Sequence, residues 1–290
     1  MPSSGLSSSF PTAPNPSGVH FLAAREVVHS LLESCPVGPA DLVLDLGAGP
    51  GAITAPLVRT GAKVIAVERD PAFARKLSNR LDGHHNLRVV TDDLRTVPLP
   101  RKEFAVVASI PYAVSSALLR RLLHPCPTPL RRAALIVEWG FAKRLARTVP
   151  RNREQAWWAA RFELELVRRV PARCFRPVPS VDSAVLAIRG RNLGLRAETA
   201  LWTLLGAAYR DPRGPARTAV AAALAGRKIR GPLQACGISP NEPAGTVPAR
   251  RWAALARRLA ADPALHWPRL PRELRAADRT APGRRRRGRS

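Results

Sequence analysis

The sequence predicts an α/β fold, a mainly parallel sheet with helices, followed by a small helical domain. Short apolar runs alternate with segments long enough to form helices, which is the pattern of βαβ units. The runs expected as strands are, in chain order, LVLDL, KVIAVE, LRVV, FAVVASI, AALIVEW and SAVLAI. Beyond Gly190 the chain becomes rich in Ala, Leu and Arg, with Gly and Pro between the segments. We therefore expect a sheet domain over residues 15–190 and a helical domain over residues 191–270.

Two tails are expected outside these domains. Residues 1–14 are rich in Ser and Pro, a composition typical of disorder. Residues 271–290 form a basic tail that ends in RRRRGRS. We expect this second tail to be flexible.

The charge of the chain indicates the class of its partner. The 290 residues include 47 Lys+Arg and 21 Asp+Glu, which gives a formal net charge of +26. Hydrophobic residues make up 46% of the chain, enough for a sizeable core, so a wholly disordered polycation is excluded. The excess of positive charge favours a polyanionic partner, with nucleic acid ahead of a membrane surface. Residues 191–270 carry thirteen basic and four acidic residues and no catalytic motif, so we interpret them as a binding domain. The alternative is that they only support the sheet.

Several classes of protein are disfavoured. No run approaches the roughly 20 apolar residues that cross a bilayer, and residues 1–20 lack the apolar segment of a signal peptide. We therefore expect a soluble, cytoplasmic protein with no membrane partner. The four cysteines and six histidines show no spacing typical of a metal site or a disulfide framework, so neither is expected.

The first expected strand runs into a glycine-rich loop. The loop residues expected to approach a cofactor closely are Gly47, Ala48, Gly49 and Gly51. The second strand ends in Glu68, followed by Arg69, and a carboxylate at that place can accept hydrogen bonds from ribose hydroxyls. The G-x-G-x-G spacing and the lack of a G-K-[ST] sequence disfavour a dinucleotide or ATP site.

This loop, with Asp45 before it and Glu68 after it, resembles the S-adenosylmethionine site of class I methyltransferases. The resemblance implies a Rossmann-like domain with S-adenosylmethionine as cofactor. It also assigns a role to Asp92 and Asp93, which follow the third strand where that family binds the adenine amino group.

A second motif follows the fourth strand and consists of Ser109, Ile110, Pro111 and Tyr112. It resembles the N-[IL]-P-[YF] motif of the ribosomal RNA adenine N6-methyltransferases, with serine in place of asparagine. The exocyclic amine of adenine is a poor nucleophile because its lone pair is delocalised into the ring. The family resemblance implies that Ser109 and the carbonyl of Ile110 hold this amine, and that Tyr112 stacks on the extruded base. Serine is shorter than asparagine, so transfer of one or of two methyl groups stays open.

Three more segments are similar to the ribosomal adenine dimethyltransferases. FRPVPSVDS, which begins at Phe175, is similar to their F-x-P-x-P-x-V-[DN]-S signature, although a phenylalanine taken alone would more often be a core residue. The signature implies that Phe175 packs on the target base opposite Tyr112. NPSGVHFL, residues 15–22, is similar to a G-Q-N-F-L motif and implies that His20 and Leu22 lie at the cofactor. Here Val19-His20 replaces the usual Gln-Asn pair.

The third segment is VEWGFAKRL, residues 137–145, which is similar to the Erm branch of the family more than to the KsgA branch. The chain is thus identified as a member of the Erm family, which modifies 23S rRNA. The resemblance implies a monomeric, metal-free enzyme that methylates N6 of one adenine before the ribosome is fully assembled. It also implies resistance to macrolide, lincosamide and streptogramin B antibiotics, and it makes residues 191–270 an RNA-binding domain.

Three alternatives stay open at this point. One is a KsgA-like dimethyltransferase that acts on 16S rRNA. The second is a catalytically weak RNA-binding homologue, suggested by Ser109 and by Val19-His20. The third is a DNA adenine methyltransferase, which the FRPVPSVDS segment disfavours.

Overall fold

The computed structural model describes residues 19–226 and 231–275. The expected N-terminal tail and residues 276–290 of the expected basic tail lie outside the described residues. The described chain forms two compact units. The first unit comprises the residues up to Leu119, Pro129–Arg147 and Phe162–Gly190, and the second comprises Arg120–Thr128, Thr148–Arg161 and the residues from Arg191 onward.

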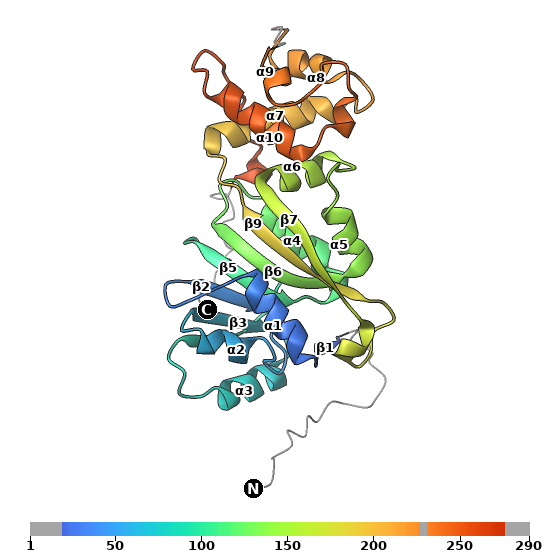
Figure 1. The fold of residues 1–290 in the computed structure, drawn as a ribbon. Coiled ribbons are helices and arrows are strands. Elements are labelled where there is room, and N and C mark those ends of the chain that lie inside the picture. The colour runs from blue at the N-terminus through green and yellow to red at the C-terminus, as the bar shows by residue number, and fades with distance from the viewer. Residues whose placement is uncertain (1–18, 227–230, 276–290) are drawn as a thin grey trace, which may run out of the picture. The chain divides into compact units, whose positions relative to one another are not determined.

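The first unit is built on a seven-stranded sheet in the order β4-β3-β2-β5-β6-β9-β7 (Figure 1). Neighbouring strands from β4 to β6 are parallel, whereas β9 is antiparallel to both β6 and β7. The strands are β2 (Leu42–Leu46), β3 (Lys63–Glu68), β4 (Leu87–Thr91), β5 (Phe104–Ser109), β6 (Leu130–Glu138), β7 (Phe162–Val170) and β9 (Ser183–Gly190). The α/β prediction is confirmed. The strand order reverses between β2 and β5, which is where open α/β sheets bind ligands at the carboxyl ends of their strands.

One strand of this sheet was not expected from the sequence. All six expected strands are present, but β7, with the sequence FELELVRRV, is additional. It lies at the edge of the sheet, and only its first and last residues, Phe162 and Val170, are buried. Its glutamates and arginines are tolerated because the edge leaves both faces partly in solvent, so the strand lacks the apolar run by which the others were found.

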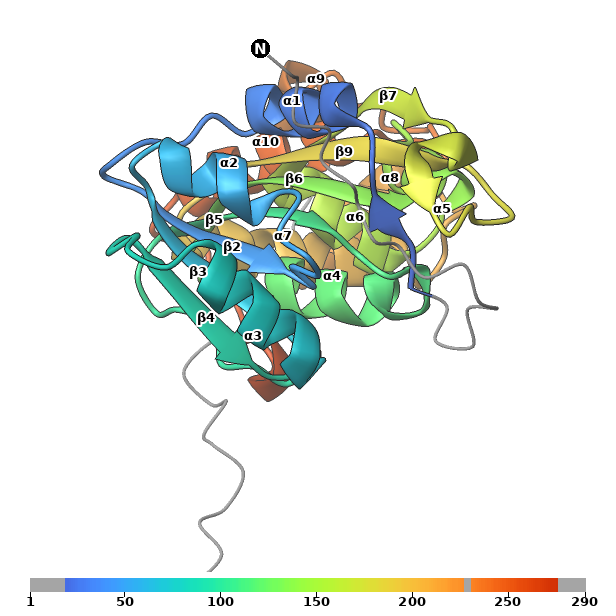
Figure 2. The same ribbon diagram turned by 90° about the horizontal axis from the view of Figure 1, so that it is seen from below.

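Three helices cover one face of the sheet, as Figure 2 shows. They are α1 (Arg25–Ser34), α2 (Thr54–Arg59) and α3 (Pro71–Arg80). Buried side chains of α1 and α2 pack in one apolar cluster with Val64 of β3. In the same strand, Ala66 packs with Leu77 of α3. Because residues two apart in a strand point to the same face, the two clusters together form the core on this side.

A two-stranded antiparallel sheet joins distant parts of the first unit. It consists of β1 (Phe21–Leu22) and β8 (Phe175–Arg176), with Leu22 opposite Phe175. Because β1 and β8 pair, the segments similar to G-Q-N-F-L and to F-x-P-x-P-x-V-[DN]-S are hydrogen-bonded neighbours. The first unit also contains α5 (Trp139–Leu145) directly after β6, and α4 (Ser115–Leu123) follows β5.

The second unit is helical, as expected for residues 191–270. Its helices are α6 (Arg153–Arg161), α7 (Leu195–Ala208), α8 (Ala216–Ala223), α9 (Gly231–Ala235) and α10 (Ala249–Ala260). In α10 the apolar stripe of Trp252, Leu255 and Leu259 is buried, and basic side chains lie on the opposite side. This amphipathic helix agrees with the spacing in the sequence.

The second unit also takes in two segments from the middle of the chain, and a buried arginine explains why. Arg161, at the end of α6, donates to a carboxylate oxygen of Glu198 in α7 at 2.7 Å. The same guanidinium donates to the carbonyls of Leu123 and Pro125 at 2.7 and 2.8 Å. A buried arginine needs all these acceptors, so it joins these segments to the helices beyond Gly190.

The expected basic tail needs a correction at its start. Arg272–Leu274 form a short 3-10 helix, and Leu274 is fully buried. Because the buried side chain of Leu274 holds these residues in place, the expectation of a flexible tail that begins at residue 271 is wrong for residues 271–275.

Among the described helices, none has the length and apolar character needed to span a membrane.

Candidate active site

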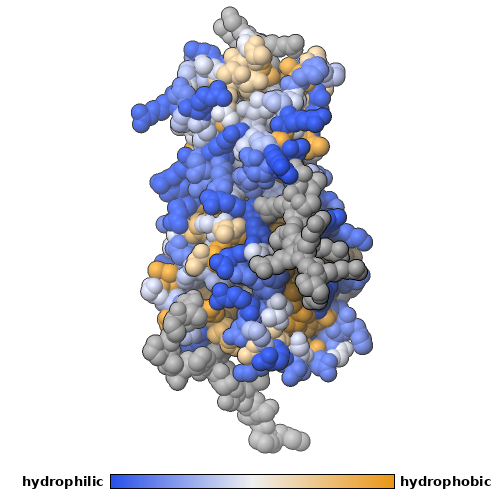
Figure 3. Space-filling view, turned by 180° about the vertical axis from the view of Figure 1, so that it is seen from behind, coloured by the Kyte–Doolittle hydropathy of each residue, from blue (hydrophilic) through white to orange (hydrophobic). Residues whose placement is uncertain are grey.

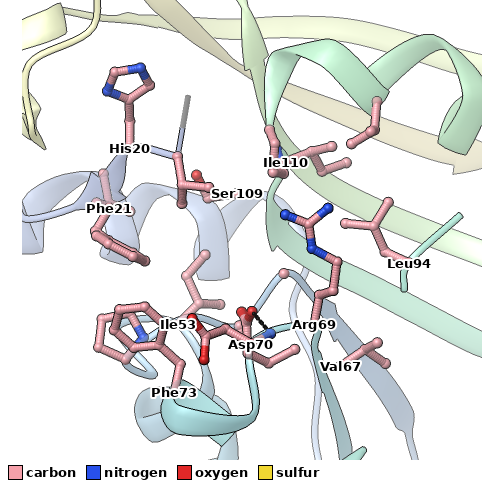
Figure 4. Close-up of a pocket in the computed structure, with 18 of the residues that line it drawn as sticks. His20, Phe21, Ile53, Val67, Arg69, Asp70, Phe73, Leu94, Ser109 and Ile110 are labelled. Carbon is pink, nitrogen blue, oxygen red and sulfur yellow. Dashed lines mark hydrogen bonds between the residues drawn. The ribbon is translucent and has the colours of Figure 1, made fainter. Parts of the chain in front are cut away.

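A cavity of about 530 Å³ opens at the carboxyl ends of β2, β3 and β5 in the first unit (Figure 4). This is the point of strand reversal. Most of the residues predicted for the site line it: His20, Leu22, Gly47, Ala48, Glu68, Arg69, Asp92, Asp93, Ser109, Ile110, Pro111, Tyr112 and Phe175. The two predicted residues that do not line it are Gly49 and Gly51.

These two glycines shape the loop from behind. Both have positive φ, +52° at Gly49 and +88° at Gly51, where a side chain would be strained. A Cβ on Gly51 would lie only 2.4 Å from Cδ1 of Leu77 in α3, and one on Gly49 would lie 3.0 Å from the ring of Phe21. The glycines therefore allow the loop to fit between α3 and β1, and their contact with a cofactor stays a prediction.

Glu68 ties the loop to the end of β3. One of its carboxylate oxygens accepts a hydrogen bond from the backbone N–H of Gly49 at 2.7 Å, and the other accepts one from the N–H of Asp70 at 2.8 Å. A carboxylate has about four lone-pair positions. Glu68 thus holds the loop and retains acceptor capacity for hydroxyl groups, so its contact with a ribose stays a prediction.

The two aspartates after β4 differ in their surroundings. Asp93 accepts hydrogen bonds from the guanidinium of Arg95, which lower the pKa of its carboxyl to about 2. Among the described residues Asp92 has no such cationic partner, and its carboxylate accepts a single hydrogen bond, from the N–H of Asp93 at 2.7 Å. Because Arg95 already occupies Asp93, Asp92 is the better candidate to bind an amino group.

Apolar side chains that the sequence analysis did not assign to the site form much of the wall. The rings of Phe21 and Phe73 have centroids 5.0 Å apart and lie at one side of the cavity, with Leu94 on the other side (Figure 4). Ile53 and Val67 also line the cavity. Phe73 lies in the first turn of α3, the helix that follows Glu68. An aromatic residue so soon after the acidic end of β3 was the sequence signal that could have marked Phe73 as part of the cavity wall.

Asp45, at the base of the loop, is fully buried. One carboxylate oxygen accepts a hydrogen bond from the Thr54 hydroxyl at 2.6 Å, whereas Oδ1 has no partner among the described residues. Burial raises the pKa of this carboxyl to about 7. The site thus combines flat apolar walls, acidic groups at two strand ends and a tight glycine loop. This combination fits S-adenosylmethionine, which has an apolar adenine, ribose hydroxyls and a charged end.

The Ser109 motif borders the same cavity. Ser109 ends β5, and its hydroxyl has no hydrogen-bond partner in the described part of the chain. The side chain of Ile110 is buried, and its N–H donates to the carbonyl of Ile136 at 3.0 Å. Tyr112 begins a short 3-10 helix, Tyr112–Val114, and its hydroxyl lies 2.6 Å from Oγ of Ser183. Burial raises the pKa of Tyr112, so the phenol stays neutral.

Phe175 does not present a free ring. It is 1% exposed, belongs to the apolar cluster under α1 and pairs with Leu22, which is 5% exposed. The core interpretation of Phe175 therefore holds in this structure, and its predicted contact with a base would require the ring to be uncovered. His20 is more open, and its ring lies nearly parallel to that of Tyr112, at an angle of 25° with centroids 6.2 Å apart.

The chain is similar to known proteins over most of its length. The model of the ribosomal RNA adenine dimethylase family matches residues 15–260. An rRNA adenine N-6-methyltransferase of Bacillus licheniformis is 28% identical over 246 residues, covering 84% of this chain and 86% of that protein. A ribosomal RNA small subunit methyltransferase A of Thermosynechococcus vestitus is 30% identical over 248 residues, covering 82% and 93%. The crystal structure of the 23S rRNA methyltransferase ErmE is similar with a TM-score of 0.70 and 28% identity, covering 82% of this chain and 99% of ErmE.

Proposed function

The chain belongs to the ribosomal RNA adenine dimethylase family and is an S-adenosylmethionine-dependent rRNA adenine N6-methyltransferase, and we propose that its target adenine lies in 23S rRNA. The proposal extends to the expected phenotype, resistance to macrolide, lincosamide and streptogramin B antibiotics. It also takes the protein to act as a monomer on RNA that is not yet fully assembled into ribosomes, because an adenine in a loop or bulge is easiest to extrude there.

The residues around the cavity divide the work of the reaction in this proposal. Glu68 and Asp92 bind the ribose and adenine of the cofactor, and the apolar walls hold the adenine ring. When bound, S-adenosylmethionine supplies an activated methyl group on a positively charged sulfur. The free hydroxyl of Ser109 and the carbonyl of Ile110 accept the N–H groups of the target amine and turn its lone pair towards the methyl group.

Positioning carries most of the catalysis here, because the leaving group is already good and no strong base is needed. The proton released from the amine passes to water. Tyr112, neutral and held by Ser183, is placed to stack on the extruded base.

The observation that carries the 23S assignment is the VEWGFAKRL segment, which resembles the Erm branch. In the structure this segment forms the end of β6 and the helix α5. Glu138 caps α5 by accepting the N–H groups of Gly140 and Phe141. Trp139 has the ammonium of Lys143 at 5.7 Å and the guanidinium of Arg169 at 5.4 Å from its ring centroid. An aromatic ring with two cations close to it suits contact with RNA, which combines bases and phosphates.

The rival assignment is 16S rRNA, which the similarity to the small subunit methyltransferase of Thermosynechococcus vestitus favours. Reverse-transcription stops mapped on both rRNAs, from cells with and without the gene, separate the two. Cells that express Tyr112→Ala serve as a control for inactive protein. We expect a new stop in 23S rRNA only with the wild type, together with growth on a macrolide. Stops confined to 16S rRNA would refute the assignment.

The helical unit is proposed to dock on RNA through its basic surface. Hydrophilic residues dominate the face of the molecule in Figure 3, with separate apolar patches between them. On α10 the side chains of Arg250 and Arg258 are exposed opposite the buried stripe. Binding to phosphates releases counterions, so affinity should fall steeply with salt. We expect Arg250→Gln with Arg258→Gln to reduce the slope of log Kd against log salt by about 2, whereas Arg59→Gln, on an exposed arginine of α2, should leave the slope unchanged.

A further inference from the structure

We propose that Arg153, the first residue of α6, binds a phosphate group of the rRNA backbone, with Arg210 as a second cation beside it. The inference rests on the proposed function, because it assigns one contact within the proposed docking of the helical unit on RNA. Arg153 lies on a helix that packs against α7, and the residues that contact its guanidinium belong to the second unit.

The guanidinium of Arg153 lies over the indole ring of Trp202, with Cζ 3.5 Å from the ring centroid. Its Nη2 donates a hydrogen bond to the backbone carbonyl of Trp202 at 3.0 Å. Trp202 is itself packed edge-on against Trp157, with ring centroids 5.2 Å apart. An arginine that is stacked on an aromatic ring keeps its plane in one orientation. The side chain is therefore arranged before any ligand arrives, and it loses little conformational freedom when it binds one.

Gly206 of α7 leaves room for this guanidinium. A Cβ at Gly206 would lie 2.9 Å from Nη2 and 3.2 Å from Cζ of Arg153. The backbone of Gly206 is helical, so its conformation does not require glycine. A glycine inside a helix makes the helix less stable than alanine would. The use of glycine here is thus the space that it leaves for Arg153.

The charge of Arg153 is not compensated as that of the buried Arg161 is. Arg161 pairs with Glu198 and donates to two carbonyls. Arg153 is partly buried and donates to one carbonyl, and in the described part of the chain no carboxylate pairs with it. Its Nε is buried without an acceptor among the described residues, whereas Nη1, which also lacks one there, is not buried. A partly buried cation without a counter-ion is unfavourable, and an anion at Nη1 would lower its energy.

Arg210 adds a second positive charge close to the first. Burial lowers the pKa of Arg153, and the nearby guanidinium of Arg210 lowers it further. Glu273, on the 3-10 helix Arg272–Leu274, acts in the opposite direction and has the smallest effect of the three. Arg210 itself is exposed just after α7. The site therefore keeps an excess of positive charge on two arginines.

A phosphate is the anion that suits this site. The flat fork of a guanidinium donates parallel hydrogen bonds to phosphate oxygens, and such contacts position a protein on a nucleic acid without reading its sequence. The chain has a net charge of +26. A polyanion is attracted by that charge, so the backbone of an RNA fits better than the carboxylate of a protein.

The test compares Arg153→Gln, Arg153→Lys, Arg210→Gln and Gly206→Ala with the wild type. The control for the loss of one charge is Arg59→Gln, on an exposed arginine of the first unit. The Kd of an rRNA fragment that the wild type methylates is measured over a range of salt concentrations. In a second arm, the Tm of each protein is measured in phosphate and in chloride at equal ionic strength, which shows whether free phosphate binds at Arg153.

Arg153→Gln should reduce the slope of log Kd against log salt by about 1 and raise the Kd on the order of tenfold at low salt. Arg153→Lys should keep the slope, because it keeps the charge, but bind less tightly, because lysine has no flat fork. Arg210→Gln should have a smaller effect, since that side chain is exposed. Gly206→Ala removes no charge, but its Cβ displaces the guanidinium, so the Kd should rise even though alanine favours the helix. Phosphate should raise the Tm of the wild type more than that of Arg153→Gln.

Two results would overturn the inference. One is a slope and a Kd for Arg153→Gln equal to those of Arg59→Gln, whatever its Tm, which would leave Arg153 as a residue that only holds α6 against α7. The other is a phosphate effect on Tm that depends on Arg153 together with an unchanged RNA slope, which would assign the site to free phosphate.

Failure of the proposed function looks different. If the helical unit does not dock through α10, Arg250→Gln with Arg258→Gln leaves the slope unchanged, while Arg153→Gln still reduces it. If the target adenine lies in 16S rRNA, the fragment that the wild type methylates comes from 16S rRNA, and the same variants are compared on that fragment.

Discussion

The buried carboxyl of Asp45 predicts a pH dependence of stability in the first unit. In the unfolded chain its pKa is near the ordinary 3.8, whereas in the folded protein burial raises it to about 7. Below the unfolded pKa the group is neutral in both states and has no effect. Between pH 4 and pH 7 the unfolded chain loses the proton and the folded protein keeps it, so the free energy of unfolding falls. Above about pH 7 the loss is complete.

The size of this effect follows from the two pKa values. A difference of roughly three pKa units corresponds to about 4 kcal/mol. Asp45→Asn cannot ionise and keeps an oxygen that can accept from Thr54. We therefore expect the wild type to lose up to about 4 kcal/mol more stability than Asp45→Asn between pH 4 and pH 8. Asp82→Asn, at an exposed carboxylate, should show the wild-type dependence.

The assay must report on the first unit. Five of the six tryptophans lie in the second unit, so total tryptophan fluorescence is unsuitable. Hydrogen exchange of peptides from β2 and β3, corrected for the intrinsic effect of pH, measures the opening of the sheet around Asp45. Parallel pH profiles for the wild type and Asp45→Asn would refute the reasoning, because they would mean that the carboxyl ionises as readily in the folded protein as in the unfolded chain.

Three further predictions concern single substitutions. Ser109→Asn restores the usual longer amide and should raise the ratio of dimethyl- to monomethyladenosine by mass spectrometry; an unchanged ratio would mean that Ser109 does not limit the second transfer. Glu198→Gln removes the charge that pairs with a buried guanidinium and should destabilise the second unit by about 3–5 kcal/mol in urea titrations followed by tryptophan fluorescence, whereas Glu154→Gln, in a more exposed pair, should cost less than about 1 kcal/mol. Gly51→Ala adds a clash with α3 to the strain of a positive φ, so its Tm should fall further than that of Gly83→Ala, which has a similar φ and open space; equal losses would exclude the clash.

Most strands that could be predicted from the sequence are well buried, although LRVV was also found and forms β4, an edge strand with no buried residue. LVLDL and FAVVASI are nearly continuous apolar runs because packed side chains cover both faces of the sheet there. β7 could not be found in this way, because an edge strand needs few buried residues and FELELVRRV offers only two. The glycine loop was also predictable, since its residue types are required by backbone conformation, which is a local property.

Which segments of the chain belong to the second unit could not be predicted from the sequence, for a different reason. Nothing local marks the segments around Leu123 and Pro125 as part of the helical unit, because the contact that includes them is made by Arg161 and Glu198, far apart in the chain. An arginine in a sequence with 47 basic residues gives no sign that it is buried. Long-range acceptors decide that, and they become visible only in the folded protein.

The part of the cavity wall formed by β1 and β8 is where a residue-by-residue comparison with the family gives the least reliable answer. The motif around Phe175 gives that residue a place at the cavity, and the structure agrees, but the exposure of its ring depends on Leu22 in β1, more than 150 residues away. The same small sheet connects His20 to the carbonyl of Pro177. A substitution in one strand of this sheet can therefore change the exposure and the contacts of a side chain in the other strand. The histidine that departs from the motif and the phenylalanine that conforms to it must be interpreted together, because the pairing of β1 with β8 places Leu22 opposite the buried Phe175 and brings His20 to the carbonyl of Pro177.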